Sequence, residues 1–559
     1  MTDENAPTLV HRFLHWEATQ PDAPAFSQPY PDGSVQDFSW SEVGDQARRM
    51  AAHLRALQLP AQSNIAILGK NSAHWIMADL AIWMAGHVSV PLYPTLSAAT
   101  AQFIFEHCGI PAIFLGKLDG KTDGWNEVRK VLPAGVHRIA LPMSPPTETP
   151  RWEEVAKTIE PLQDVHLPAP ADLATIIYTS GTTGNPKGVM HSFGNIMAYA
   201  RGSREFSKLT RSERLLSYLP LAHAAERSFI ESNWLHNGFH VFFSDCLETF
   251  TQDLRRARPT LFISMPRLWT KFYGAANAAL TADERRQLAE GSGAADAVKA
   301  KILTMLGLQD VRLAFTGAAP LPAEIASWYR TLGLELLDVY GQSEDFAWSH
   351  YSRPGEVRLG YSGTALPGVE RRIADNGEIL IRSVTRMLGY YKEPELTAQA
   401  ITPDGFVRTG DRGEVDELGR LKITGRVKEI FKTSKGKYVS PAPIENRFTH
   451  PKFEAVCVTG PGYPQPFALL LPGPGVLQQL DDPAARDTLV AELQALLDQV
   501  NATLEDHERL THVVVVRDPW SIDNGFLTPT MKIKRSVIEE RYLSKAQGWA
   551  ELGLKVILE

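Results

Sequence analysis

The fold is decided by the segment Ala174-Thr-Ile-Ile-Tyr-Thr-Ser-Gly-Thr-Thr-Gly-Asn-Pro-Lys-Gly-Val-Met190. Its first part, residues 175–178, is apolar and β-branched, which is typical of a buried strand. The rest combines glycines, hydroxyl side chains and Lys187. Glycine lets the backbone approach a ligand closely, and hydroxyl and amide groups bind phosphate oxygens. The segment predicts a loop that cradles a polyphosphate, with a plain turn between two core elements as the alternative.

The position of the lysine separates this loop from the P-loop of phosphotransferases. In the P-loop the lysine directly follows the last glycine, whereas Lys187 lies three residues after Gly184 and directly after Pro186. A phosphotransferase is therefore disfavoured. The residues expected to contact nucleotide phosphates are Thr179, Ser180, Gly181, Thr182, Thr183, Gly184 and Lys187.

Length and composition indicate at least two domains. A chain of 559 residues is longer than a domain with a single hydrophobic core usually is. Its content of 44% hydrophobic and 22% charged residues is typical of a globular protein. A net charge of −7 argues against nucleic acid as the main partner. The three cysteines form no metal-ligand pattern and the N-terminus is acidic, which together favour a reducing, cytoplasmic location.

Hydropathy gives no transmembrane segment. The most apolar early run, residues 75–86, is interrupted by Asp79 and is too short to span a bilayer. Peripheral contact with a membrane and a homodimer both stay open.

Strand and helix patterns alternate along the first 340 residues or so, which indicates parallel sheets covered on both faces. Residues 281–301 predict one solvated helix interrupted near Gly291. Shorter alternating runs at about 355–425 predict a β-rich subdomain, and the remaining part has the length of a small α+β domain. We expect an α/β fold with domains of residues 1–427 and 428–559. The expected strands include 64–68, 88–90, 111–115, 175–178, 214–218, 240–243, 261–264, 312–315, 335–339 and 513–516, and the expected helices include 40–57, 73–85, 98–107, 488–503 and 536–546.

A second motif, Asp338-Val-Tyr-Gly-Gln-Ser-Glu344, follows an expected strand, where open α/β sheets bind ligands. Glu344 offers a hard oxygen ligand for a Mg²⁺ ion shared with nucleotide phosphates, and Tyr340 offers a flat face for adenine. The alternative is a turn followed by an acid that compensates a helix dipole. The candidates for nucleotide binding in this motif are Asp338, Tyr340, Gly341, Gln342, Ser343 and Glu344.

Three further candidates are weaker when each stands alone. The small residues Gly317, Ala318 and Ala319 would let a planar base lie against the backbone, although an ordinary strand-to-helix turn is the preferred explanation when the motif stands alone. Asp411 could accept both ribose hydroxyls or simply belong to a turn. Arg426 could contact the nucleotide or pair with a surface acid.

The two candidates for direct catalysis are Lys532 and His223. Lys532 lies in a basic, turn-flanked segment near the C-terminus, where a cation could neutralise charge between a carboxylate and an α-phosphate. The alternative is a solvated basic face. His223 could gate a carboxylate site, or it could be a core or helix-capping residue.

These motifs, taken in chain order, resemble those of the acyl-adenylate-forming superfamily, which includes acyl-CoA synthetases, luciferases and the adenylation domains of peptide synthetases. The resemblance covers nearly the whole chain. It implies a large N-terminal domain of two sheets plus the β-rich subdomain, and a small C-terminal lid that moves about a hinge at Lys428. It also implies ATP, coenzyme A and a Mg²⁺ ion held by Thr179 and Glu344.

Several stretches look like the long-chain acyl-CoA synthetase branch. They are Leu219-Pro-Leu-Ala-His with Glu226-Arg227, Met265-Pro-Arg-Leu-Trp269, and Gly436-Lys-Tyr-Val-Ser-Pro441. Met531, before the catalytic lysine, and Ser383 stand where many relatives carry glycine. The first departure agrees with the long-chain branch.

The resemblance implies activation of a carboxylic acid, a medium- or long-chain fatty acid, to acyl-AMP and then to a CoA thioester. Lys532 would serve the first step, and the loop of Lys435, Gly436 and Lys437 would lie beside the thiol tunnel in the second. The acyl pocket would pass Phe229, Ile230 and Trp234, which are equally plausible as core. Rival readings are a ligase that delivers acyl-AMP to a carrier-protein thiol, and a catalytically silent nucleotide-binding protein.

Overall fold

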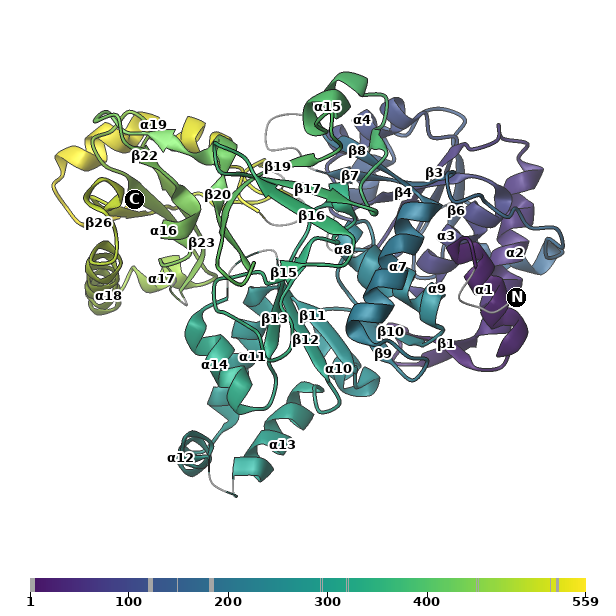
Figure 1. The fold of residues 1–559 in the computed structure, drawn as a ribbon, viewed down its shortest axis with the longest axis horizontal. Helices are drawn as coiled ribbons and strands as arrows, with labels where there is room; N and C mark the ends of the chain where they lie inside the picture. The colour runs from purple at the N-terminus through teal and green to yellow at the C-terminus, as the bar shows by residue number, and fades with distance from the viewer. Residues whose placement is uncertain are drawn as a thin grey trace.

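Two lobes of unequal size make up the protein (Figure 1). The large lobe runs from purple to green, and the small, mainly yellow lobe holds the C-terminal part of the chain. The molecule is a computed structural model. It describes residues 6–118, 124–147, 149–179, 185–291, 293, 295–317, 319, 321–448, 450, 452–522, 524–528 and 532–559.

A seven-stranded sheet organises the first part of the large lobe, with strand order β18-β8-β7-β4-β3-β5-β6. The five strands from β7 to β6 pair in parallel, whereas β8 and β18 are antiparallel. β3, β4 and β5 are buried throughout, as expected of strands covered on both faces. The strands are β3 (Asn64–Leu68), β4 (Val88–Leu92), β5 (Ala112–Leu115), β6 (His137–Ala140), β7 (Leu173–Thr179), β8 (Lys187–Ser192) and β18 (Gly389–Tyr390).

A second group of strands continues the large lobe. The order β2-β1-β10-β9 forms one sheet and β11-β12-β13-β14-β15 another, with β11 lying next to β9. The β1–β2 hairpin was not predicted. The strands are β1 (Pro24–Pro29), β2 (Val35–Ser39), β9 (Arg214–Ser217), β10 (His240–Phe243), β11 (Leu261–Ser264), β12 (Leu313–Gly317), β13 (Leu336–Tyr340), β14 (His350–Tyr351) and β15 (Thr364–Ala365).

Helices cover these sheets. The stretch expected as one interrupted solvated helix is two helices, α12 and α13, because α13 buries Val298, Ile302 and Leu306 in a local core. The helices of the large lobe are α1 (Leu9–Thr19), α2 (Trp40–Ala56), α3 (Ala73–Ala85), α4 (Ala98–Cys108), α5 (Gly124–Val128), α6 (Trp152–Thr158), α7 (Phe193–Ser207), α8 (Ala224–Glu226), a π-turn (Arg227–Ser232), α9 (Asn233–Asn237), α10 (Phe250–Ala257), α11 (Pro266–Ala279), α12 (Ala282–Glu290), α13 (Ala295–Leu306), α14 (Ala323–Thr331) and α15 (Pro394–Ala400).

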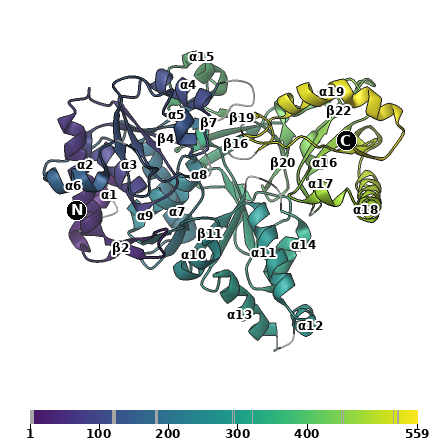
Figure 2. The same cartoon turned by 180° about the vertical axis from the view of Figure 1, so that it is seen from behind.

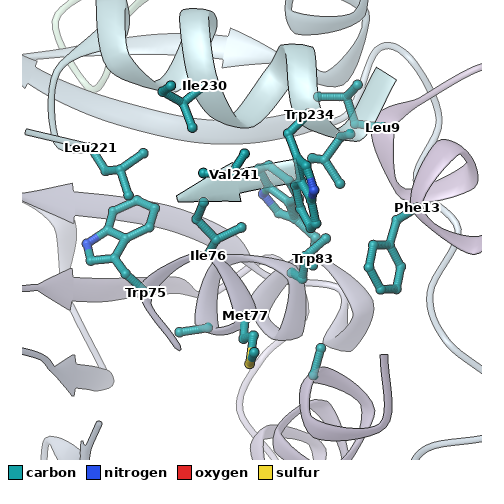
Figure 3. Packing of buried hydrophobic residues seen from close by; sticks show 14 of the residues in the cluster. Leu9, Phe13, Trp75, Ile76, Met77, Trp83, Leu221, Ile230, Trp234 and Val241 are labelled. Carbon is teal, nitrogen blue, oxygen red and sulfur yellow. The ribbon is translucent and has the colours of Figure 1, made fainter. Parts of the chain in front are cut away.

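The main core lies where α3 meets the π-turn and α9. Figure 3 shows Trp75 and Ile76 of α3 facing Leu221, Ile230 and Val241. Trp234 stacks on Trp40 with 4.7 Å between ring centroids and an interplanar angle of 12°. Phe229, Ile230 and Trp234 are all buried in this cluster, which confirms the core reading of these residues.

A four-stranded antiparallel sheet, of order β16-β17-β19-β20, lies within the stretch expected to be β-rich. It leads directly into the small lobe, which both views place beside β20 (Figures 1 and 2). Its strands are β16 (Val369–Ile373), β17 (Glu378–Ser383), β19 (Val407–Val415) and β20 (Leu421–Arg426).

The small lobe has cores of its own, which lie on the two faces of the sheet β23-β24-β25-β26. α18 (Pro483–Asn501) and α19 (Arg535–Glu551) contribute to different cores. Across the described parts of both lobes, no helix has the length and apolar composition that crossing a bilayer requires. The remaining elements of this lobe are β21 (Phe431–Lys432), β22 (Tyr438–Val439), α16 (Pro441–Glu445), β23 (Phe453–Thr459), β24 (Phe467–Pro472), α17 (Val476–Gln479), β25 (Val513–Val515) and β26 (Val556–Leu558).

Candidate active site

The glycine-rich loop joins two antiparallel strands. Thr179 ends β7, Lys187 begins β8, and the two residues are paired across the hairpin. The Lys187 ammonium lies 5.0 Å from the centre of the Tyr390 ring. The strand pair therefore fixes both ends of the loop. The predicted phosphate-binding residues Ser180, Gly181, Thr182, Thr183 and Gly184 lie outside the described residues.

The carboxyl ends of β12 and β13 bring two other motifs to one edge. Gly317 is paired with Val339. A Cβ atom on Gly317 would lie 2.8 Å from Val339 Cγ2, so glycine is required at this position. Ala319 is exposed, and Ala318 lies outside the described residues. Open α/β sheets bind their ligands beside the carboxyl ends of such strands.

Asp338 stands on β13 near the same edge. Burial raises the pKa of its carboxyl group to about 7, and a hydrogen bond from Ser362 opposes that rise. Because ribose and adenine groups are hydrogen-bond donors as well as acceptors, an acid that titrates near neutrality can serve them in either protonation state.

The turn that carries Glu344 is held at several points. Met387 donates its backbone N–H to the Glu344 carbonyl at 2.8 Å, and the Tyr390 hydroxyl donates to Glu344 Oε1 at 2.9 Å. His191 Nε2 lies 2.7 Å from the Ser343 carbonyl. Burial lowers the pKa of His191 to about 4, so the neutral ring donates this bond.

The residues after Glu344 adopt an uncommon backbone. Phe346 and Ala347 have φ of +53° and +61°, in the left-handed region that non-glycine residues rarely occupy. A Cβ atom on Gly341 would lie 2.6 Å from the Ala347 backbone, so glycine is required there. Phe346 is fully buried and packs edge-on against His191, with 5.0 Å between ring centroids.

Asp411 is the centre of a polar cluster beside this turn. Its Oδ2 accepts hydrogen bonds of 2.8 Å from both the Tyr340 hydroxyl and Gln342 Nε2. Its Oδ1 lies 3.0 Å from Arg426 Nε, the side chains being 7% and 41% exposed. Asp411 is paired with Arg426 across β19 and β20. A ribose that binds Asp411 would share or replace these partners.

Lys532 comes from the small lobe to the same junction. Its backbone N–H donates to Thr528 Oγ1 at 3.1 Å, and its side chain is exposed. Although the side chain keeps contact with solvent, the protein around it removes part of its hydration. This partial desolvation and the charge of Arg426 lower the pKa of the ammonium group, against the opposing charges of Asp411 and Glu429. Lys532 therefore lies within electrostatic range of the Asp411–Arg426 pair.

His223 faces the same lysine from the large lobe. Burial, and then the Lys532 charge, lower the pKa of its imidazole to about 4. The ring also caps α8, since its Nδ1 accepts the backbone N–H of Ala225 at 3.1 Å. His223 therefore caps α8, which was the alternative considered from the sequence, and it also lies near Lys532.

The remaining predicted residues lie in the small lobe or at its entrance. Lys428 is in the 3₁₀ turn Val427–Glu429, immediately after β20. Lys435, Gly436 and Lys437 form the exposed turn between β21 and β22, with φ of +79° at Gly436. The contacts recorded for this hairpin turn, through Thr433 and Tyr463, remain within the small lobe.

The donor set of the site fits a metal that is shared with a nucleotide. Within the described residues no three His, Cys, Asp or Glu side chains gather into a metal cage. The hydroxyl of Thr179 and the carboxylate of Glu344 are hard oxygen ligands, and Mg²⁺ normally takes one or two protein ligands and completes its shell with phosphates and water.

Sequence reasoning missed the buried groups that support the His223 turn. Glu226 Oε1 accepts hydrogen bonds from the Ser217 hydroxyl and the Tyr218 N–H, both at 2.9 Å, and from Asn71 Nδ2 at 3.2 Å. Burial raises the pKa of the Glu226 carboxyl group to about 8. This carboxyl fixes the start of the segment that leads to His223.

A buried cluster around an arginine begins at the next residue. Arg227 contacts Asp79 of α3 and, at 3.1 Å, Glu231, with no side chain of the three more than 2% exposed. Burial raises the pKa of Glu231 well above its usual value, against the attraction of Arg227. The sequence feature that could have predicted this cluster is Asp79, which interrupts an otherwise apolar helix.

Comparison with known proteins agrees with this geometry. The AMP-binding enzyme family matches residues 13–391, and the AMP-binding enzyme C-terminal domain matches residues 428–547. The chain is 31% identical to the long-chain-fatty-acid–CoA ligase FadD15 of Mycobacterium bovis over 92% of this chain and 93% of that one. It is 29% identical to long-chain-fatty-acid–CoA ligase 6 of Homo sapiens, over 96% and 86%.

Solved structures share the fold. The A domain of carboxylic acid reductase from Segniliparus rugosus, in complex with AMP and a co-purified carboxylic acid, superposes with a TM-score of 0.79 at 23% identity, covering 98% of this chain and 95% of that one. O-succinylbenzoate coenzyme A synthetase from Bacillus subtilis, in complex with AMP, gives 0.72 at 21% identity, covering 94% and 97%. By the family match over most of its length, the chain belongs to the AMP-binding enzymes.

Proposed function

We propose that the protein is a fatty acyl-CoA synthetase that uses ATP to activate a long-chain fatty acid. The observation that carries this proposal is the position of Lys532, a cation of the small lobe whose charge acts on His223, Asp411 and Arg426 of the large lobe. The names of the relatives, long-chain-fatty-acid–CoA ligases over more than 90% of this chain, support the acid class.

In the first half-reaction a carboxylate oxygen attacks the α-phosphorus of ATP, which forms acyl-AMP and releases pyrophosphate. Both reactants are anions, so catalysis consists of positioning and charge neutralisation. Lys187 and the loop 179–184 hold the β- and γ-phosphates, Asp411 holds the ribose, and Lys532 bridges carboxylate and α-phosphate. His223 has a neutral ring and adds no charge to the carboxylate site.

Thr179 and Glu344 would hold Mg²⁺, which when bound neutralises phosphate charge. The remaining residues of the nucleotide site act on the base and sugar. Gly317 and Ala319 leave the adenine a bare backbone surface, and Tyr340 and Gln342 orient the Asp411 carboxylate through the bonds described above.

In the second half-reaction the CoA thiol attacks the acyl carbonyl carbon of the mixed anhydride, and AMP leaves. Lys532 has no role in this step. The lid, residues 428–559, would turn about Lys428 and bring the Lys435–Lys437 turn to the site, so that one site serves two reactions by conformational exchange.

The test is pyrophosphate release by the purified protein over a series of acids from acetate to long-chain and aromatic acids, with CoA present. We expect kcat/KM to rise with chain length, because each buried CH₂ contributes about 0.8 kcal/mol, until the pocket is filled. Absence of AMP formation with every acid would overturn the proposal. Thioester formation on a phosphopantetheinylated carrier protein, but not on CoA, would assign the carrier-protein reaction instead.

A further inference from the structure

Tyr390 stands between the two opposite charges of the phosphate site. Its ring faces the Lys187 ammonium at 5.0 Å, and its hydroxyl donates to Glu344 Oε1 at 2.9 Å. The side chain is 7% exposed. A cation over an aromatic face is attracted by the ring quadrupole, and a hydroxyl bonded to a carboxylate makes a charge-assisted hydrogen bond. One side chain thus binds both charged groups.

The backbone fixes Tyr390 in this place. Leu388 donates its N–H to the Met190 carbonyl at 2.9 Å, and Tyr391 donates to the Gly188 carbonyl at 2.8 Å, so that β18 is attached to β8 on either side of Tyr390. Gly389 has φ of +151°, and a Cβ atom there would lie 2.8 Å from Thr397 Cγ2. These contacts fix the backbone of β18 on both sides of Tyr390.

The arrangement prevents the two charges from neutralising each other. Lys187 and Glu344 share Tyr390 as a neighbour, yet among the ion pairs of the described residues none joins them. A direct ion pair would occupy the ammonium and the carboxylate that a nucleotide and its metal need. A phenol is protonated at neutral pH, so the Tyr390 hydroxyl remains a donor to Glu344.

We propose that Tyr390 is a positioning residue that keeps Lys187 and Glu344 apart and oriented, the first toward nucleotide phosphates and the second toward their metal ion. The inference rests on the proposed function, because it assumes that this site binds ATP. It differs from a packing role, since it predicts separate effects of the hydroxyl and of the ring.

The experiment compares Tyr390→Phe, Tyr390→Leu and the control Tyr391→Phe. Tyr391 is the next residue, and its hydroxyl contacts Asn64 instead, at 3.0 Å. ATP binding is measured by calorimetry with Mg²⁺ and with EDTA, and the half-saturating Mg²⁺ concentration is measured in pyrophosphate release. Tyr390→Phe frees only Glu344, so half-saturating Mg²⁺ should rise threefold or more while ATP binding in EDTA stays unchanged.

Tyr390→Leu should weaken ATP binding in EDTA by threefold or more, because Lys187 can then pair with Glu344. The double variant Tyr390→Leu, Glu344→Gln removes that partner and should restore metal-free binding, which a packing role would not do. Tyr391→Phe should match the wild type in both measurements.

Unchanged Mg²⁺ dependence in Tyr390→Phe would overturn the inference, and so would equal effects of Tyr390→Phe and Tyr391→Phe. If Tyr390→Leu fails to fold, Tyr390→Phe decides alone. A wild-type protein that binds no ATP refutes the proposed function itself, whereas a wild-type protein that binds ATP, with variants that behave alike, refutes only the role of Tyr390.

Discussion

Two arginines of the large lobe, one in its core and one at the junction with the small lobe, are paired in different ways. Arg227 is 1% exposed and lies between Asp79 and Glu231, both buried to the same degree. Arg426 is 41% exposed and pairs with Asp411 at the junction of the lobes. A buried charge must keep its partners, whereas a half-exposed one can exchange a protein partner for a ligand. The core side of the site is therefore a fixed frame, and the junction side is where substrates and the lid compete for charge.

The strongest test of this contrast is Arg227→Met. The substitution leaves two carboxyl groups buried without their cation, and we expect a loss of about 3–5 kcal/mol of unfolding free energy. Urea unfolding followed by tryptophan fluorescence measures it, with Arg286→Met on exposed α12 as a control that should cost less than 1 kcal/mol. Equal unfolding midpoints for the two variants would contradict the fixed frame.

On the junction side, Lys532→Ala should abolish one half-reaction and spare the other. Loss of the cation between two anions should lower ATP–pyrophosphate exchange by about 10²–10³-fold. Conversion of supplied acyl-AMP and CoA to acyl-CoA should stay near the wild-type rate, and so should both reactions in the nearby Lys534→Ala. If the rates of both half-reactions fall equally in Lys532→Ala, the proposal that each lid position serves one half-reaction is wrong.

Much of this contrast lies beyond what the sequence alone can predict. The ranges of β3, α3, β10 and β11 agree with the prediction, because each is a short apolar or periodic run bounded by turn residues. The parallel pairing of β1 with β10 was missed because the two strands lie more than 200 residues apart, through the pairs Phe26–Val241 and Ser27–Phe242. Local patterns carry no information about such pairings.

The same reason limits prediction of the site. Lys532, His223 and Asp411 were found as motif residues, and in the structure His223 and Asp411 both lie within electrostatic range of Lys532. Tyr390 was missed because its contacts depend on the pairing of β18 with β8. Glu226 was noted only as part of a family motif, and its burial by Ser217 and Asn71 follows from the tertiary fold.

On the core side, the free energy of unfolding should depend on pH through Glu226, and this effect is smaller than the preceding ones. Glu226 has a folded-state pKa of about 8 against an ordinary value of 4.5, so the folded state binds its proton more tightly. The stability that it contributes is complete below pH 4.5 and is lost as pH rises through about 8, with about 1 kcal/mol lost between pH 7 and 8.

Glu226→Gln keeps the acceptor and cannot ionise, so its unfolding midpoint in urea should depend less on pH over this interval. The exposed Glu290→Gln on α12 should retain the wild-type dependence. Identical pH dependence in wild type and Glu226→Gln would show that the carboxyl group is already ionised in the folded protein.

The smallest expected effect concerns an exposed ion pair between the two lobes. Arg267 of α11 lies 3.0 Å from Glu454 of β23, and the side chains are 69% and 29% exposed. An exposed pair contributes about 0–1 kcal/mol. Arg267→Ala should therefore shift the ratio of adenylation to thioester formation by less than about fivefold, toward thioester formation. A larger shift, or one that survives high salt, would mean that the junction is held as firmly as the core.

The left-handed backbone at Phe346 and Ala347 limits how far the protein can be stabilised. Each such residue costs roughly 1–2 kcal/mol, which the burial of the Phe346 ring offsets. Ala347→Gly would relieve part of this cost. It would also allow the backbone just after Glu344 to adopt other conformations. Thermostable variants designed by removing backbone outliers would therefore gain melting temperature at this turn and lose turnover, so residues 346 and 347 should be excluded from such designs.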